Sequence, residues 1–301
     1  MLRPAEVGKD RLTTMPNIKL LQPTSLNEAV SLLSEHSDET KIVSGGTALV
    51  IMLRNRLIAP ATLLSLGRLP ELRSIRHESG TGLRIGALVT IREAEMSPIV
   101  REKHPVLAQT FGKVGNVRVR NAATVGGNLS EADYASDPPC VLVALRARVK
   151  ARSANGEREI PLTDFFKGFY ETVLAPDEIL TELIVPDQAP GSRATYLKYV
   201  SRSSEDRPCV GMAVVLEQES DGACKDLRLV AGAVSETPQE IAAAETMARG
   251  QRLSDSLIEE IAGAYSTGIE ALSDLRGSGW YRQQIIRVMA RRAMQQVLAR
   301  N

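Results

Sequence analysis

The sequence is poor in the features that mark several large classes of protein. It has three cysteines, Cys140, Cys209 and Cys224, which lie far apart without CxxC or CxH spacing. A zinc or iron–sulfur site in this chain is therefore not expected. An odd, dispersed set of thiols instead indicates a reducing compartment, and we expect a cytoplasmic protein. No run of about eighteen apolar residues is present, so we expect no transmembrane helix.

Aromatic residues and net charge are also scarce. Only 4% of the 301 residues are aromatic, and the formal net charge is +1. The sequence thus has neither the stacking side chains nor the basic field typical of nucleic-acid-binding proteins. It contains no GxSxG, HExxH or P-loop motif, which gives no support to hydrolase or phosphoryl-transfer chemistry.

Two similar glycine loops are present, about eighty residues apart. The stretch "IVSGGTALV", residues 42–50, and the stretch "ATVGGNLSEADYASDPP", residues 122–138, each place a glycine pair beside serine or threonine. Glycine permits positive φ and close approach to the backbone, and exposed amides in such loops bind pyrophosphate. We expect the two loops to form two walls of one site. Asp137, nine residues after Asn128, is placed to bind a ribose hydroxyl.

The first part of the chain reads as β-α-β, followed by hairpins. Ser25 and Glu28 have capping-box spacing before a helical apolar period, and residues 41–46 read as a strand ending in the first glycine pair. Residues 72–88 alternate as a hairpin, Thr90 and Glu93 form a second capping pair, and Asn155-Gly156 predicts another hairpin turn.

After a linker near residue 191 the pattern changes. Three strand-like stretches precede three helix-like stretches, which predicts a separate α+β domain. The last helix has one apolar face, made of Ile286, Met289, Ala290, Ala293 and Val297. We interpret its arginines, Arg282, Arg287, Arg291, Arg292 and Arg300, as a solvated face rather than a nucleic-acid or membrane surface. Gly80, Gly82 and Gly86 lie in a hairpin with the wrong spacing for a dinucleotide fingerprint.

On these loops and three later features the chain resembles the FAD-binding subunit of the molybdenum hydroxylases, the xanthine dehydrogenase and aerobic carbon monoxide dehydrogenase family. The resemblance covers roughly residues 15–300. The later features are Asp137, Leu180 in "DEILTELIVP" and Lys198 in "YLKYVSR". The position of a phenylalanine that xanthine dehydrogenase places against the flavin is Val114 here, which favours the carbon monoxide dehydrogenase branch. The resemblance assigns these cofactor-binding residues: Ile42, Val43, Ser44, Gly45, Gly46, Thr47, Ala48, Leu49, Val114, Thr124, Val125, Gly126, Gly127, Asn128, Asp137, Leu180 and Lys198.

The resemblance implies an α+β chain with the two-lobed FAD-binding fold of vanillyl-alcohol oxidase (PCMH) type. A flexible tail, residues 1–14, would precede the FAD-binding domain, residues 15–188, with lobes at about 15–68 and 69–188. A C-terminal domain with a three-stranded sheet and helices would span residues 191–301. Residues 44–47 and 124–128 would hold the pyrophosphate, Asp137 the ribose or phosphate region, and Leu180 and Lys198 would border the isoalloxazine.

The implied function is electron transfer within a larger complex. A large subunit would oxidise substrate at a molybdopterin cofactor, a small subunit would carry two [2Fe–2S] clusters, and FAD here would pass electrons to an external acceptor. Such complexes assemble as dimers of heterotrimers. Because substrate is chosen in another polypeptide, carbon monoxide, an aldehyde and an N-heterocycle all stay open. The alternatives are a stand-alone flavin oxidoreductase of the same fold, such as the enolpyruvyl-UDP-glucosamine reductase type, and a non-catalytic scaffold whose glycine loops are only turns.

Overall fold

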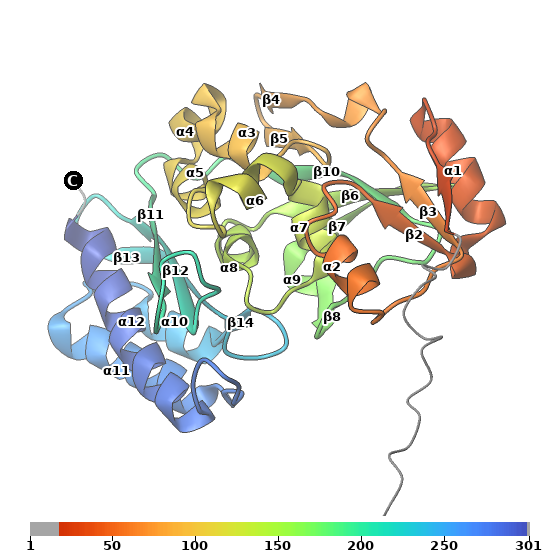
Figure 1. Cartoon of the computed structure of the whole chain (residues 1–301). Helices are drawn as coiled ribbons and strands as arrows, with labels where there is room; N and C mark the ends of the chain where they lie inside the picture. The colour runs from red at the N-terminus through yellow and green to blue at the C-terminus, as the bar shows by residue number, and fades with distance from the viewer. Residues whose placement is uncertain (1–17, 300–301) are drawn as a thin grey trace, which may run out of the picture.

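The computed structural model describes residues 18–299, so the tail expected at residues 1–14 lies outside the described residues. Three main sheets follow one another along the chain (Figure 1). Each sheet is made by one continuous part of the sequence, and each has its own helices. The glycine loops lie on the first and second of these parts.

The first part is a small parallel sheet with strand order β1-β3-β2. Its elements are β1 (Lys19–Leu21), α1 (Leu26–Glu35), β2 (Thr40–Val43), α2 (Leu49–Arg54) and β3 (Thr62–Ser65). Ser25 caps α1 as predicted, because its hydroxyl accepts from the amide of Glu28. The Glu28 carboxylate, however, bonds Thr24 and not Ser25, so the expected reciprocal capping box is displaced by one residue. The predicted β-α-β order is confirmed, with the first glycine pair between β2 and α2.

The second part is a five-stranded antiparallel sheet with order β4-β5-β10-β6-β7. Its strands are β4 (Ile75–Glu78), β5 (Gly82–Gly86), β6 (Arg148–Ser153), β7 (Gly156–Pro161) and β10 (Ile179–Val185). Both predicted hairpins form, and Gly156 takes a φ of 133° at the turn between β6 and β7. A short helix, α9 (Leu162–Phe165), and a two-stranded ribbon, β8 (Phe166–Gly168) and β9 (Glu171–Thr172), precede β10.

Six helices between β5 and β6 gather over this sheet (Figure 1). They are α3 (Ile91–Met96), α4 (Pro98–Lys103), α5 (Pro105–Phe111), α6 (Val117–Ala122), α7 (Val125–Glu131) and α8 (Asp137–Ala144). The Thr90–Glu93 capping box at the start of α3 is confirmed on both sides. Helices α4 to α7 were not predicted. They are six or seven residues long, too short for the apolar period to show.

The third part is an antiparallel sheet with order β11-β12-β13-β14 and three helices. Its elements are β11 (Arg193–Tyr199), β12 (Val210–Gln218), β13 (Cys224–Gly232), β14 (Gln239–Glu240), α10 (Ala242–Ala248), α11 (Asp255–Gly268) and α12 (Gly279–Ala299). The three long strands match the expectation, and the two-residue β14 is an addition to it. The predicted apolar face of α12 is buried throughout.

The arginines of α12 divide into two kinds. Arg287 and Arg292 are exposed and Arg291 is half-buried, in agreement with a solvated face. Arg287 and Arg291 pair with Glu259 on α11, at 2.5 and 3.3 Å. Arg282 has no exposed surface at all, so its assignment to the solvated face was wrong. Its guanidinium bonds the Asp274 carboxylate and the carbonyls of Leu272, Gly277 and Cys209. Arg300 lies outside the described residues.

Helix α8 connects the second and third parts. It packs against α5 on one side and against β12 and β13 on the other. The main hydrophobic cluster accordingly contains α8 residues such as Val141 together with Tyr196, Ala213 and Val230 from the third part. Because α8 begins at Asp137, a predicted site residue stands where the two parts meet.

Candidate functional site

The first glycine loop runs from Ser44 to Ala48 and joins β2 to α2. Gly46 adopts a φ of 69°, which favours glycine. The Gly46 carbonyl accepts from the Val50 amide at 3.0 Å and so starts the helix. Among the residues that the structure describes, no hydrogen bond reaches the amides of residues 45–48. This half-buried loop therefore presents a set of free donors, as expected for a pyrophosphate site.

The second glycine loop differs from this expectation. Residues 124–128 form the first turn of α7, and their amides are already used inside the chain. Val125 and Gly126 donate to the carbonyls of Val89 and Ala87, both at 2.9 Å. The Thr124 hydroxyl caps Gly127, at 3.1 Å, and the Thr124 carbonyl accepts from Asn128. The expectation of exposed amides thus holds for the first loop and fails for amides 125–128.

The structure brings the two loops into direct contact. The Ser44 Oγ lies 2.9 Å from the Thr124 Oγ1. A side chain on Gly45 would overlap the carbonyl group of Ala122, whose carbon would be 2.8 Å from the added Cβ. On Gly127, an added Cβ would be 2.8 Å from both hydroxyls. Both glycines are therefore needed for one loop to approach the other.

Asp137 and Lys198, predicted as separate cofactor contacts, form a buried ion pair. The Lys198 Nζ lies 3.0 Å from the Asp137 Oδ2, and their side chains are only 6% and 5% exposed. The other carboxylate oxygen accepts from the Tyr196 hydroxyl at 2.7 Å. Lys198 also donates to the carbonyl of Lys113 at 2.8 Å, the residue before Val114. An ammonium has three donors, and no third acceptor for Lys198 is found within residues 18–299.

Burial dominates the electrostatics of this pair. Desolvation raises the pKa of the Asp137 carboxyl, and the nearby Lys198 ammonium and Tyr196 hydroxyl oppose that shift. Burial likewise raises the pKa of Tyr196 well above its ordinary value, and the charge of Asp137 adds to the effect. The phenol thus stays protonated and acts as a donor. Asp137 is in consequence a neutralised carboxylate rather than a free acid or base.

Val114 and Leu180 share the main hydrophobic cluster, whereas Ile42 packs against the cluster of the first part. Val114 packs against the main cluster, and its carbonyl accepts from Arg120 at 3.0 Å. Leu180 is buried in β10 at an irregularity in the pairing with β6, and such bulges are frequent beside functional sites. Its neighbour Thr181 accepts from the Ala87 amide, and Ala87 in turn bonds Gly126. Leu180 therefore lies beneath α7 and its glycine loop.

Two residues of the site were missed by the sequence reasoning. Tyr196 lies two positions before Lys198 in β11, so the period of a strand places both side chains on one face. Ser136 exchanges hydrogen bonds of 2.9 and 3.1 Å with the Asn128 side chain and precedes Asp137. The Tyr196 signal was available in "YLKYVSR", but the Ser136 contact depends on the fold.

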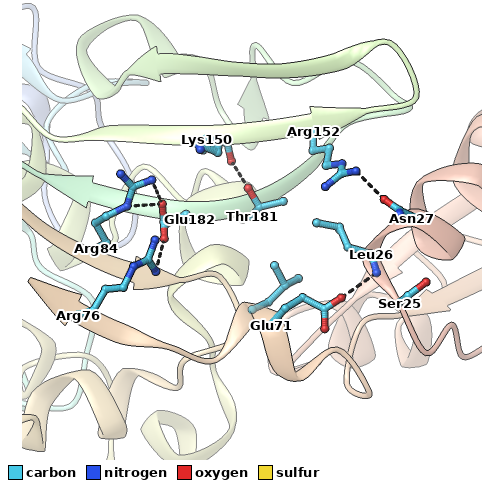
Figure 2. A pocket seen from close by; sticks show the side chains of 11 residues that line it. Ser25, Leu26, Asn27, Glu71, Arg76, Arg84, Lys150, Arg152, Thr181 and Glu182 are labelled. Atoms are coloured by element: carbon cyan, nitrogen blue, oxygen red, sulfur yellow. Dashed lines mark hydrogen bonds and ion pairs between the residues drawn. The ribbon is translucent and has the colours of Figure 1, made fainter. Parts of the chain in front are cut away.

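A cavity of about 410 Å³ lies elsewhere, between the start of α1 and the open face of the second sheet (Figure 2). Its walls include Arg152, which donates to Asn27, and Glu71, which accepts from the Leu26 amide. None of the predicted site residues lines it. The cavity is therefore separate from the glycine loops, despite its size.

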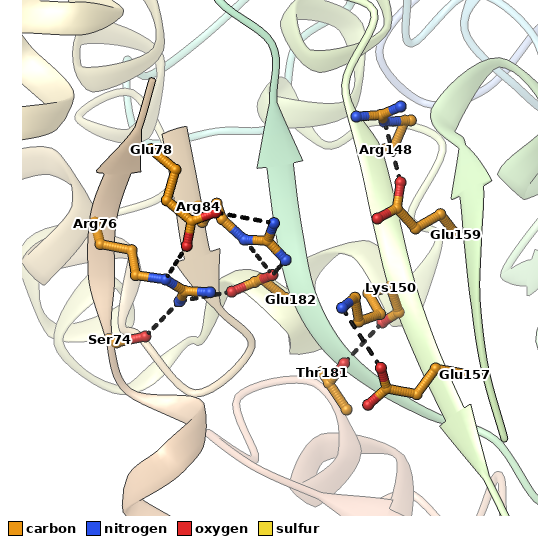
Figure 3. A network of polar contacts seen from close by, with 10 residues as sticks. All are labelled: Ser74, Arg76, Glu78, Arg84, Arg148, Lys150, Glu157, Glu159, Thr181 and Glu182. Carbon is orange, nitrogen blue, oxygen red and sulfur yellow. Dashed lines mark hydrogen bonds and ion pairs between the residues drawn. The ribbon is translucent and has the colours of Figure 1, made fainter. Parts of the chain in front are cut away.

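The polar groups around this cavity satisfy one another. Glu182 pairs with Arg76 at 2.7 Å and with the Arg84 Nε at 2.8 Å, while Lys150 pairs with Glu157 on the neighbouring strand (Figure 3). Opposite charges on neighbouring strands stabilise a sheet, and Glu182, which is buried, has its charge met by both arginines. This arrangement explains the charged walls without a ligand.

Metal ligands and a membrane span are absent from the described chain. No group of three or more His, Cys, Asp or Glu side chains within residues 18–299 is arranged to hold a metal ion. All three cysteines are buried and free. None of the helices described is long and apolar enough to cross a bilayer.

The loops and the buried pair fit a bound flavin dinucleotide. Free amides at 45–48 suit the pyrophosphate, and the unpaired donor of Lys198 suits a polar atom beside the apolar Val114. The arrangement suits a ligand and balances charge, and the Asp137 carboxylate within it is already paired with Lys198 and Tyr196. Such a site fits a chain in which the cofactor supplies the reactivity.

Comparisons with known proteins agree with this geometry. Residues 16–188 match the family described as the FAD binding domain in molybdopterin dehydrogenase, and residues 195–297 match the CO dehydrogenase flavoprotein C-terminal domain. The glyceraldehyde dehydrogenase medium chain of Sulfolobus acidocaldarius is 34% identical over 282 residues, 94% of this chain and 99% of that one. The nicotine 6-hydroxylase medium subunit of Paenarthrobacter nicotinovorans is 32% identical over 286 residues, 95% and 99% of the two chains.

A solved structure matches the whole architecture. The carbon monoxide dehydrogenase of Hydrogenophaga pseudoflava aligns with a TM-score of 0.91 at 32% identity, over 96% of this chain and 99% of that chain. The two-lobed FAD-binding fold with its C-terminal α+β domain is thereby confirmed, as is the oxidoreductase class. The chain belongs to the FAD-binding medium subunits of the molybdenum hydroxylase family.

Proposed function

We propose that this subunit takes electrons from the [2Fe–2S] clusters of a small partner subunit and passes them to an external acceptor. A large molybdenum-cofactor subunit would oxidise the substrate, and the assembly would be a dimer of heterotrimers. The observation that carries the proposal is the internal neutralisation of Asp137. This deeply buried carboxylate is held by Lys198 and Tyr196 and is not available for proton transfer to a substrate.

Each predicted site residue then has a binding or positioning role. The amides of residues 45–48 would bind the FAD pyrophosphate, and residues 124–128 would form the wall that holds the first loop in place. Val114 and Leu180 would offer apolar contacts, whereas Lys198 would direct its third N–H at a polar atom of the flavin. FAD, when bound, supplies the capacity to accept and release electrons.

Asp137 acts on the cofactor mainly through Lys198 in this scheme. Its carboxylate fixes the ammonium, which would otherwise lie unpaired in a buried place. Two of its lone pairs are still unused, since a carboxylate accepts up to about four hydrogen bonds. A direct bond to a ribose hydroxyl is therefore compatible with the pair.

The names of the relatives support a multi-subunit complex, because they are called medium chain and medium subunit. The test is anaerobic bleaching of the flavin by carbon monoxide, aldehydes and N-heterocycles, each offered to the isolated chain and to the complex reconstituted from all three subunits. We expect bleaching by one of these substrates only when all subunits are present. Rapid bleaching of the isolated chain by an organic substrate would instead indicate a stand-alone oxidoreductase.

A further inference from the structure

A leucine at the apex of a tight turn is almost completely exposed. Leu275 has 99% of its surface accessible. It sits in the turn that joins α11 to α12, where Asp274 and Gly277 exchange backbone hydrogen bonds of 3.0 and 3.2 Å. A single exposed leucine needs no explanation by itself. The network of hydrogen bonds that holds Leu275 in place, however, requires one.

The turn is held by a buried network. The Asp274 Oδ1 accepts from the Arg282 Nη2 and from the Arg276 amide, both at 2.7 Å, and Oδ2 accepts from the Tyr134 hydroxyl at 2.8 Å. Arg282 is fully buried and also donates to the carbonyls of Leu272 and Gly277. Burying a guanidinium is unfavourable unless its hydrogen bonds are satisfied. Here those bonds fix the backbone on both sides of Leu275.

The Asp274 carboxyl stays ionised in this network. Burial raises the pKa of its carboxyl, but the hydrogen bonds from the Arg276 amide, Arg282 and Tyr134 outweigh that effect and hold the pKa well below its usual value. The turn therefore keeps its shape across the physiological range of pH. A rigid apolar projection loses little conformational entropy when a partner covers it.

Aromatic rings adjoin the turn. Tyr134, which bonds Asp274, packs edge-on against Phe169 and Tyr170, at centroid distances of 5.1 and 6.3 Å. Arg276 lies 5.5 Å above the Tyr134 ring. Phe169 and Tyr170 are 47% and 45% exposed. Aromatic side chains and arginine are the residue types enriched at the centres of protein interfaces.

A hollow of about 260 Å³ lies beside Leu275. Its lining residues are Ser201, Arg202, Asp206, Arg207, Leu275 and Arg276. Two of the three arginines already have acidic partners, because Arg207 pairs with Asp133 at 2.8 Å and Arg276 pairs with Asp274. Arg202 is exposed and has no hydrogen bond or ion pair with any described residue. Its guanidinium is therefore suited to receive a carboxylate of another protein.

We propose that the Leu275 surface, made of Phe169, Tyr170, Arg202, Arg207, Leu275 and Arg276, docks the iron–sulfur subunit. This rests on the electron-transfer function proposed above. Leu275 would enter an apolar pocket of the partner, and carboxylates around that pocket would meet Arg202. The surface adjoins the end of α7, the helix that begins at the second glycine loop, because the Tyr170 amide donates to the Ala132 carbonyl at 3.1 Å and Arg207 pairs with Asp133. A protein seated there approaches the flavin, as an electron donor must.

The test measures binding of the purified small iron–sulfur subunit to the FAD-loaded chain by titration calorimetry. We expect Leu275→Asp to weaken binding by roughly tenfold or more, as truncation of an interface anchor does. Arg202→Glu should weaken binding less and should make the remaining affinity less sensitive to salt. Leu20→Asp is the matched control, since Leu20 is 55% exposed on β1, away from this surface, and should change nothing.

The possible outcomes distinguish failure of the docking proposal from failure of the proposed function. FAD content and thermal midpoint should be unchanged in Leu275→Asp, because its side chain contacts solvent. Binding within twofold of the unsubstituted chain would overturn the docking surface. Normal small-subunit binding with loss of the large subunit, or of self-association, would assign the surface to a different occupant and also overturn it. Absence of any small-subunit binding by the unsubstituted chain would instead contradict the proposed function.

Discussion

The two glycine loops use their backbone amides differently. In the first glycine loop (loop one, residues 44–48) the amides of residues 45–48 have no partner in the described chain. In the second (loop two, residues 124–128) the amides of residues 125–128 donate to the carbonyls of Val89, Ala87 and Thr124 and to the Thr124 hydroxyl. Both loops carry a glycine pair and a hydroxyl residue. In loop one the pair leaves a concave set of donors. In loop two it lets α7 sit against Ala87, since a Cβ on Gly126 would be 2.6 Å from the Ala87 side chain.

The comparison shows that a glycine pair indicates close approach without saying what approaches. For loop one the best candidate is a ligand, and for loop two it is the protein itself. Loop two then extends through Asn128 and Ser136 to the buried pair of Asp137 and Lys198. The following substitutions test whether one side of the site serves the ligand and the other serves the fold.

The largest effect is expected at Asp137, on the fold-facing side. Asp137→Ala leaves the Lys198 ammonium buried without its counter-charge, which should lower the free energy of unfolding by about 3–5 kcal/mol. Urea unfolding of the apo-protein measures this. The double variant Asp137→Ala, Lys198→Met removes both charges and should regain most of the loss. If Asp137→Ala lowers only FAD affinity, at unchanged stability, Asp137 belongs to the ligand-facing side.

Gly45 lies in loop one, yet its substitution should affect stability, because its Cα hydrogen points at loop two. Gly45→Ala places a methyl group into the Ala122 carbonyl and 3.0 Å from the Ala123 Cα, and we expect a loss of about 3 kcal/mol from this overpacking. Gly263→Ala in α11 is the control. No atom lies within 4 Å of its added Cβ, so helix propensity should stabilise it by roughly 0.5–1 kcal/mol. Equal thermal midpoints for the two variants would contradict the loop contact.

Gly46 tests the ligand-facing side. Gly46→Val places a branched side chain at a φ of 69°, costing about 1–2 kcal/mol, and puts its Cβ 3.3 Å from the Val50 Cγ2, so the loop that carries the free amides must shift. FAD content should collapse while the circular dichroism stays native. Gly127→Val should lose FAD as well, but with a larger fall in stability, because its Cβ enters the Ser44–Thr124 contact. Purification of both variants with full FAD would refute the pyrophosphate assignment.

The smallest effects concern the bond between the loops. Thr124→Val removes both the cap on Gly127 and the contact with Ser44, and should cost about 1 kcal/mol or slightly more. Ser44→Ala removes only the contact and should cost roughly 0.5–1 kcal/mol. Thermal unfolding with and without added FAD distinguishes them. An equal cost for the two would mean that Thr124 does not act as a cap.

Local signals in the sequence predicted local structure well. The Thr90–Glu93 capping box, the Asn155-Gly156 turn and the apolar face of α12 each depend on residues a few positions apart, and each was confirmed. One residue separates α4 from α5 and five separate α5 from α6, and α6 buries none of its residues completely. The sequence of α6 therefore shows no helical period of apolar residues.

The candidate site was predicted as a set of residues but not as a geometry. The Asp137–Lys198 pair joins residues 61 positions apart, and the Ser44–Thr124 contact spans 80. Nothing in either residue's neighbours encodes such a contact. Arg282 shows the same limit, because it donates to the Cys209 carbonyl 73 positions away, whereas the helix pattern alone placed it with the exposed arginines.

The position of α8 determines how the chain should respond to proteolytic cleavage between its domains. The two family matches end at residue 188 and begin at residue 195, which makes residues 189–194 a natural place to cut. Yet α8 packs against α5 from the part before that linker and against β12 and β13 from the part after it, and the Cys140 thiol donates to the Val230 carbonyl at 3.1 Å. A protease nick in the linker should therefore yield two fragments that remain associated and elute together from a sizing column. Expressed separately, each fragment would expose half of a shared core, so gene fragments split at this linker should give insoluble halves.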